Sequence, residues 1–120
     1  MKLEVGMYVR TKDGYINKIK KVNQFNVLVY GRDLFGEELN IPNNEITKAS
    51  YNIIDILEVG DILVDDTNRK LEILLIDNEL MVRNAGLIYD NNYYLPIKSI
   101  AIKSAITHEQ MEQMAYKVVE

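Results

Sequence analysis

The chain alternates between short β-prone runs and turn signals, which recur about every 8–12 residues. The sharpest turn signal is Asp13-Gly14, because glycine accepts the positive φ of a tight hairpin. The spacing of Ile16, Ile19 and Val22 would suit a helix, but the hairpin signal before them favours a bent or bulged strand. In the first half we expect strands at residues 7–11, 15–22, 25–30 and 38–41, followed by residues 45–50 and 51–57 as further strands or as a short helix and a strand.

The second half repeats this order of elements and then adds a helix. Thr107 followed by Gln110 is a capping box, in which each side chain satisfies a backbone N–H of the other residue. It predicts a helix of roughly two turns with Met111 and Met114 on one face. The expected strands are residues 61–64, 70–76, 79–83 and 93–95, a long run over residues 97–106 and a last strand over residues 116–119.

A repeat at an offset of 54 residues relates the two halves. The tetrad Leu3-Glu4-Val5-Gly6 returns as Leu57-Glu58-Val59-Gly60. We therefore interpret the chain as two copies of one small β unit, the alternative being a single mixed β domain with an accidental echo. At the same offset Ile19 matches Ile73, Pro42 matches Pro96, Ile46 matches Ile100 and Ser50 matches Ser104.

The expected fold is mainly β, a tandem pair of small SH3-like five-stranded barrels or sheets with a short helix near residues 108–114. The first SH3-like unit would span residues 1–56 and the second residues 57–120. Docking of the two units would bury more apolar surface than either buries alone, at ~25 cal/mol per Å². The join at Ile53–Leu57 is apolar and lacks a Gly, Pro or Ser run, so we expect one compact body.

Composition supports a small protein with a core and no disulfides. The apolar fraction of 48% and the charged fraction of 27% argue against disorder. The absence of cysteine excludes disulfides, thiolate metal sites and cysteine nucleophiles, and it fits a reducing cytoplasm as the location. We expect no signal peptide, because the N-terminus lacks a basic region followed by an apolar run, and no membrane span, because the most apolar run, Leu71–Ile76, is short.

Charge is uneven along the chain. The formal net charge of −4 argues mildly against non-specific binding to nucleic acid. Residues 1–54 nevertheless carry eight basic and six acidic side chains, so a local basic face on the first unit stays open.

No nucleophile, base and orienting group can be assembled, so we expect no enzyme, no catalytic residue and no cofactor. His108 is the only histidine, and we expect a surface residue at a helix start. It has no second histidine or cysteine with which to share a metal ion. Asp65 and Asp66, with Asp61 and Asp77 nearby, lack the spacing of a calcium loop, so we expect a solvated turn and no metal site.

Two groups of side chains are candidates for binding. Aromatic residues in the expected loops could form a groove for a protein partner, or they could fill space between the units. Basic residues of the first hairpin could line a phosphate-binding face, or they could only keep a strand face soluble. The partner-binding candidates are Phe35, Tyr89, Tyr93 and Tyr94, and the nucleic-acid-binding candidates are Arg10, Lys12, Lys18 and Lys20.

The amino-acid sequence of three segments resembles that of a family of small uncharacterised proteins encoded by phages and prophages of Gram-positive bacteria. The segments are Tyr8–Ile16, Ile46–Asp61 and the close of the chain, Ile106–Met111 with Tyr116–Val118. These segments carry no known chemistry, so the resemblance implies context alone: a cytoplasmic accessory protein of a mobile element.

The sequence therefore leads to a non-enzymatic binding module, with a protein as the expected partner. Nucleic-acid binding through the basic strand face of the first unit is the first alternative. Sequestration of a small nucleotide is the second.

Overall fold

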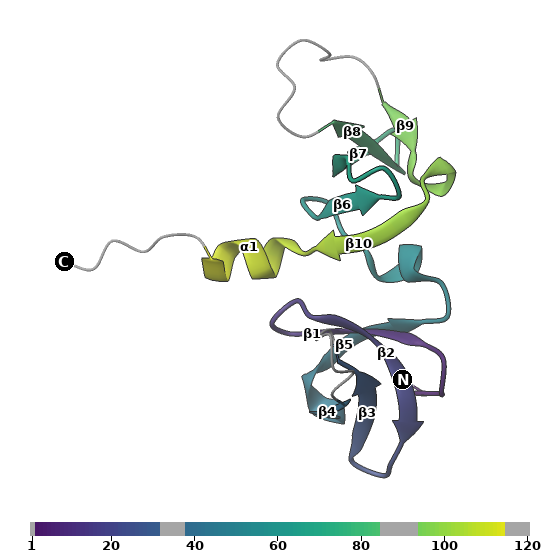
Figure 1. Ribbon diagram of the computed structural model, residues 1–120, viewed down its shortest axis with the longest axis vertical. Coiled ribbons are helices and arrows are strands. Elements are labelled where there is room, and N and C mark those ends of the chain that lie inside the picture. The colour runs from purple at the N-terminus through teal and green to yellow at the C-terminus, as the bar shows by residue number, and fades with distance from the viewer. Residues whose placement is uncertain (1, 32–37, 85–93, 115–120) are drawn as a thin grey trace, which may run out of the picture. The chain divides into compact units, whose positions relative to one another are not determined.

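The computed structural model of the chain describes residues 2–31, 38–84 and 94–114, and it divides into two units, Met1–Ile56 and Leu57–Glu120 (Figure 1). The described residues form two antiparallel five-stranded sheets and one short C-terminal helix. The expectation of a mainly β chain built from tandem small units is confirmed. None of the helices within these residues is both long enough and apolar enough to cross a membrane.

The first unit is a meander of four strands with a fifth strand that returns to the first. The strand order in the sheet is β4-β3-β2-β1-β5. A short 3₁₀ turn precedes β5 and another follows it (Figure 1). The elements are β1 (Tyr8–Thr11), β2 (Ile16–Val22), β3 (Asn26–Tyr30), β4 (Glu38–Pro42), η1 (Asn43–Glu45), β5 (Ile46–Ser50) and η2 (Ile53–Ile56).

Alternation along the strands builds the core of this unit. In β3, Val27 and Val29 are fully buried while Tyr30 is exposed, as the period of two requires. The register of β2 against β3 shifts between Ile19 and Lys21, which confirms the expected bulge. One packed cluster of this core consists of Val9, Ile19, Val27, Val29, Ile41 and Ile46, with Leu3, Met7 and Ala49 packed against it.

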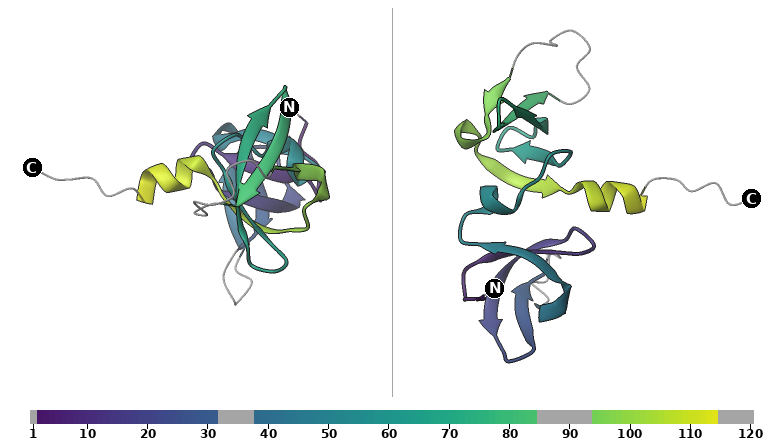
Figure 2. Two further views of the ribbon diagram at one scale, coloured as in Figure 1. Left: turned by 90° about the horizontal axis from the view of Figure 1, so that it is seen from above. Right: turned by 180° about the vertical axis from the view of Figure 1, so that it is seen from behind.

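The second unit has the same strand order. Read from the matching edge it is β9-β8-β7-β6-β10, where the first unit has β4-β3-β2-β1-β5. Its helix begins as the capping box predicts: Thr107 N–H donates to Gln110 Oε1 at 3.1 Å, and Gln110 N–H donates to Thr107 Oγ1 at 3.3 Å. Figure 2 shows the helix following β10. The elements are β6 (Ile62–Asp65), β7 (Lys70–Ile76), β8 (Glu79–Asn84), β9 (Leu95–Pro96), η3 (Ile97–Ser99), β10 (Ile102–Ile106) and α1 (His108–Met114).

One expectation for the second unit is wrong. Residues 97–106 do not form one long strand, because residues 97–99 make a 3₁₀ turn before β10 begins. Pro96 starts this turn with φ −60° and ψ 136°, as Pro42 starts the matching turn with φ −60° and ψ 140°. Ile100 N–H then donates to Ile97 O at 3.2 Å. The expected strand over residues 116–119 lies outside the described residues.

The repeated tetrads form the same turn in both units. Gly6 and Gly60 have φ of 92° and 95°, values that residues other than glycine rarely adopt. Gly6 N–H donates to Ile19 O at 3.0 Å, and Gly60 N–H donates to Ile73 O at 3.1 Å. The first two strands of each unit also pair in the same register. Val9 faces Asn17 in the first unit, and Leu63 faces Leu71, each 54 positions later, in the second.

We expect Gly6→Ala and Gly60→Ala each to lower the free energy of unfolding by about 1–2 kcal/mol, the cost of a left-handed conformation for an L side chain. There is room for a methyl group at both sites. An added Cβ would lie 3.7 Å from Tyr51 at Gly6 and 3.5 Å from His108 at Gly60, which are ordinary van der Waals distances. Urea denaturation measures the change. Val5→Ala and Val59→Ala, at exposed positions of the same turns, are the controls and should change stability by less than about 0.5 kcal/mol.

Asp65 organises the hairpin turn between β6 and β7. The expected solvated turn holds for Asp66 and Asp77, which are exposed, but it is wrong for Asp65, which is 2% exposed, and for Asp61, which is fully buried. Asp65 Oδ1 accepts from the backbone N–H of Thr67 at 3.0 Å and of Arg69 at 2.8 Å, and Oδ2 accepts from Arg69 Nε at 2.8 Å. Burial alone would raise the pKa of Asp65, but hydrogen bonds from Arg69 and Thr67 outweigh it and lower the pKa to about 2.

Asp65→Asn should therefore destabilise the protein in a pH-dependent way. The folded-state pKa lies below the unfolded one, so the ionised carboxylate stabilises the fold above about pH 4 and loses this effect as the pH falls toward 2. The stability difference between wild type and Asp65→Asn should be largest at pH 7 and should shrink between pH 4 and pH 2. Urea titrations at these pH values measure it, with the exposed Asp66→Asn as control. A difference that is constant with pH would contradict this role.

Candidate functional site

Most of the aromatic candidates cannot be placed. Phe35, Tyr89 and Tyr93 lie outside the described residues. Tyr94 is described, and it is half-buried directly before β9. Whether these rings form one surface therefore stays a prediction.

Arg10 lies in the interior rather than on a basic face. Arg10 is fully buried, and its Nη1 donates a hydrogen bond to the carbonyl oxygen of Ile56 at 2.9 Å. Strand β1 is buried at Val9, Arg10 and Thr11 in succession, so the alternation that would expose Arg10 does not hold there. Arg10 therefore supports the end of the first unit and does not join the exposed lysines.

We expect Arg10→Met to lower the free energy of unfolding by about 1.5–3 kcal/mol, the range for a hydrogen bond to a charged group. The methionine keeps most of the apolar stem, but the Ile56 carbonyl loses its donor. Lys18→Met on the exposed face is the matched control, with an expected change within about 0.5 kcal/mol. Equal effects of the two substitutions would mean that the burial of Arg10 has no energetic role.

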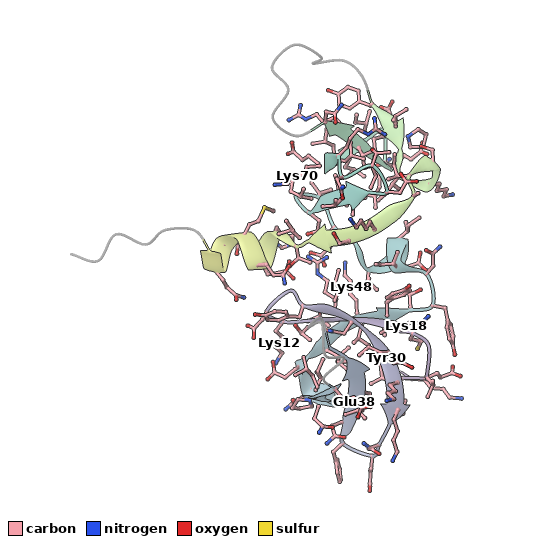
Figure 3. The ribbon with its side chains drawn as sticks, in the orientation of Figure 1. Lys12, Lys18, Tyr30, Glu38, Lys48 and Lys70 are labelled. Carbon is pink, nitrogen blue, oxygen red and sulfur yellow. The ribbon has the colours of Figure 1, made fainter. Side chains whose placement is uncertain are left out.

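The candidate lysines Lys12, Lys18 and Lys20 are all exposed, and the latter two lie on the outward side of β2. Each of these two ammonium groups stands 5.7 Å from the centre of a tyrosine ring, Lys18 over Tyr8 and Lys20 over Tyr30. Figure 3 marks Lys12, Lys18, Tyr30 and Glu38.

Lys20 is paired with an acid as well as with a ring. Its ammonium group forms an ion pair with Glu38 on β4, and this hydrogen bond raises the pKa of Lys20. Tyr30 and Glu38 face each other across β3 and β4, so the ring, the ammonium and the carboxylate form one row on the sheet. The positive charge of Lys20 is thus already compensated on this face.

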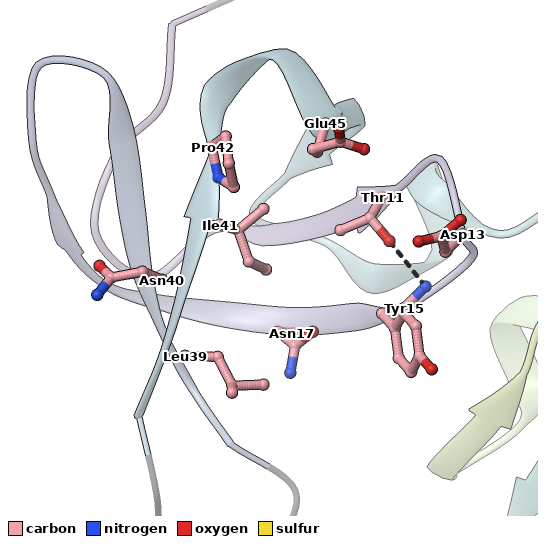
Figure 4. Close-up of a pocket in the computed structure, with 9 residues that line it drawn as sticks. All are labelled: Thr11, Asp13, Tyr15, Asn17, Leu39, Asn40, Ile41, Pro42 and Glu45. Carbon is pink, nitrogen blue, oxygen red and sulfur yellow. Dashed lines mark hydrogen bonds between the residues drawn. The ribbon is translucent and has the colours of Figure 1, made fainter.

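The first unit also contains a groove that sequence reasoning did not identify. It has a volume of about 290 Å³ and lies between the β1–β2 hairpin and β4 with the η1 turn. Figure 4 shows Tyr15 and Asp13 at one end and Leu39 and Asn40 at the other, with Ile41 between them. The lining residues are Thr11, Asp13, Tyr15, Asn17, Leu39, Asn40, Ile41, Pro42 and Glu45.

The groove combines an apolar floor with fixed polar groups. Tyr15 is 47% exposed and Leu39 is 49% exposed, so both offer surface to a ligand. Tyr15 is held from its backbone, because its N–H donates to Thr11 Oγ1 at 3.0 Å (Figure 4). The Asn17 amide is also fixed, since Nδ2 donates to Tyr30 O at 3.0 Å. A largely preformed groove of this kind loses little entropy when a ligand binds.

Acidic side chains give the groove its charge. Asp13 and Glu45 line it, and none of its lining residues is basic. An aromatic ring and two carboxylates around an apolar floor favour a ligand with both a cationic and an apolar part. The sequence held one signal for this site: Tyr15 directly follows a turn glycine and precedes the buried Ile16, which directs Tyr15 outward.

A second cluster of functional groups lies in the second unit. Glu58, His108 and Glu109 bring one ligand atom each within 4.8 Å of one another. His108 begins α1, as predicted, but it is half-buried and contacts Glu58 rather than standing free on the surface. The contact with Glu58 was missed because the two residues are 50 positions apart.

Comparison of the chain with protein family models, with curated proteins and with solved structures found no match.

Proposed function

We propose that the first unit is a non-enzymatic binding module of SH3-like architecture that takes an extended segment of a protein partner into its groove. The observation that carries this proposal is the groove itself, in which Tyr15, Leu39 and two carboxylates surround a preformed apolar floor. The five-stranded antiparallel sheet of the first unit supports the small SH3-like architecture expected from the sequence. In the context that the resemblance implies, the protein would be an accessory factor of a phage or prophage.

The charge of the groove selects among peptide ligands. Asp13 and Glu45 favour a lysine or arginine next to apolar or proline residues, because the cation can meet a carboxylate while its neighbour packs on the Tyr15 ring. An acidic segment would be repelled. The proposed partner therefore presents an extended basic and apolar segment.

Nucleic-acid binding is the second candidate, and one observation favours it. Lys18 over Tyr8 and Lys20 over Tyr30 interleave basic and aromatic groups on one sheet face, as single-strand binders do. Against it stand the burial of Arg10 and the ion pair of Lys20 with Glu38. We therefore place this candidate below the peptide groove.

Selection of random 12-residue peptides on the full chain tests the proposal. We expect enriched peptides to combine Lys or Arg with apolar residues and to shift the amide signals of the groove residues in NMR titrations. Tyr15→Ala with Leu39→Ala should weaken binding at least tenfold, which corresponds to about 1.4 kcal/mol. Both side chains are half-exposed, so the thermal midpoint should change little.

The matched control is Phe25→Ala with Tyr30→Ala, which removes two exposed aromatic rings outside the groove. It should leave peptide affinity unchanged. Enrichment of acidic peptides, or shifts that map away from the groove, would contradict the proposal. Salt-sensitive binding of a single-stranded oligonucleotide that is lost in Lys18→Ala would favour the second candidate instead.

A further inference from the structure

The cluster in the second unit is centred on the imidazole of His108. Its Nε2 lies 2.7 Å from Glu58 Oε1 and 3.0 Å from Glu109 Oε1. On the other side of the ring, Nδ1 lies 3.8 Å from Glu112 Oε1. The side chains of His108, Glu58 and Glu109 are between about one-fifth and one-third exposed, so the cluster is partly enclosed but still reached by solvent.

A buried carboxylate holds the two segments of this cluster together. Asp61 is fully buried, and its Oδ2 accepts from the backbone N–H of Glu58 at 2.7 Å. Its Oδ1 accepts from the backbone N–H of His108 at 2.9 Å. The backbones that carry the Glu58 and His108 side chains are thus fixed by one charged residue, which preorganises the cluster.

The equivalent position of the first unit is built differently. Met7 stands 54 residues before Asp61, and Glu4 N–H approaches Met7 Sδ at 3.2 Å. Glu4 there forms a hydrogen bond with Tyr51 instead of contacting a histidine. Partial loss of solvent, and then this hydrogen bond, raise the pKa of Tyr51. The same tetrad therefore carries a tyrosine partner in one unit, and a histidine with a second glutamate in the other.

We propose that Glu58, His108 and Glu109 form a binding site for a divalent first-row transition metal, of which Zn²⁺ is the representative. One imidazole nitrogen and two carboxylate oxygens suit Zn²⁺ better than Ca²⁺ or Mg²⁺, which take oxygen ligands alone. Three protein ligands leave a coordination position for water or for a fourth ligand. Glu112 Oε1 lies 3.8 Å from the other ring nitrogen, beyond hydrogen-bond distance, and its side chain is 77% exposed, so Glu112 is not part of the proposed site.

Metal binding competes with a proton at this site. A metal ion binds the neutral imidazole, and Nε2 is the ring nitrogen that faces both glutamates. The site does not depend on the peptide groove, because all of its residues belong to the second unit.

Calorimetric titration of Zn²⁺ into the chelator-treated full chain, prepared without a polyhistidine extension, tests the proposal at pH 7.5. We expect saturable binding of one ion per chain. Co²⁺ should compete for the same site and should give strongly shifted imidazole signals in ¹H NMR. These signals are unambiguous because the chain has a single histidine.

His108→Asn and Glu58→Gln each remove a ligand and should each weaken Zn²⁺ binding at least about 100-fold. The matched control is Glu4→Gln, which changes the equivalent glutamate of the first unit and should leave affinity unchanged. If His108→Asn unfolds by circular dichroism, Glu109→Gln, which keeps the size of the side chain, replaces it, with the same expected loss. The proposal is overturned if Zn²⁺ does not bind saturably, or if it binds these variants as tightly as wild type.

Discussion

Each unit depends on one backbone hydrogen bond that joins its opening turn to the deepest part of its core. The glycine that ends the tetrad donates its N–H to the carbonyl of a fully buried isoleucine, Ile19 in the first unit and Ile73 in the second. The next hydrogen bond runs back, from the isoleucine N–H to the carbonyl of Met7 or Asp61. This pair of bonds sets the register of the first hairpin, and the rest of each sheet is added to that hairpin.

Much of this fold could be predicted from the sequence because local chemistry determines it. Asp13-Gly14 and the capping box at Thr107 each act within a few residues, and each forms as expected. The turn at residues 97–99 could not be predicted in the same way. In Ile97-Lys98-Ser99 an apolar residue is followed by polar ones, and the burial of Ile97, which is 3% exposed, is compatible with a strand and with a turn.

The candidate sites were harder to predict because they depend on contacts between distant residues. Alternation placed Lys18 and Lys20 on one exposed face correctly, but it could not show that Glu38 compensates one of them. The burial of Arg10 depends on a carbonyl 46 residues away. The groove likewise joins a hairpin to β4, and the contact between His108 and Glu58 spans 50 residues, so no local pattern announces either.

The last strand of each unit shows how a duplicated sheet tolerates an insertion. Val9 pairs with Ala49, and Leu63 pairs with Ala105, so the offset of 54 that holds for the early strands has grown to 56. Ser50 and Ser104 therefore match in sequence but not in the sheet. The two extra residues, 100 and 101, lie between η3 and β10, so the connection takes them up, whereas one extra residue inside a strand would move its inward side chains to the outer face. Changes of length in such a module should accordingly gather in the connections between strands.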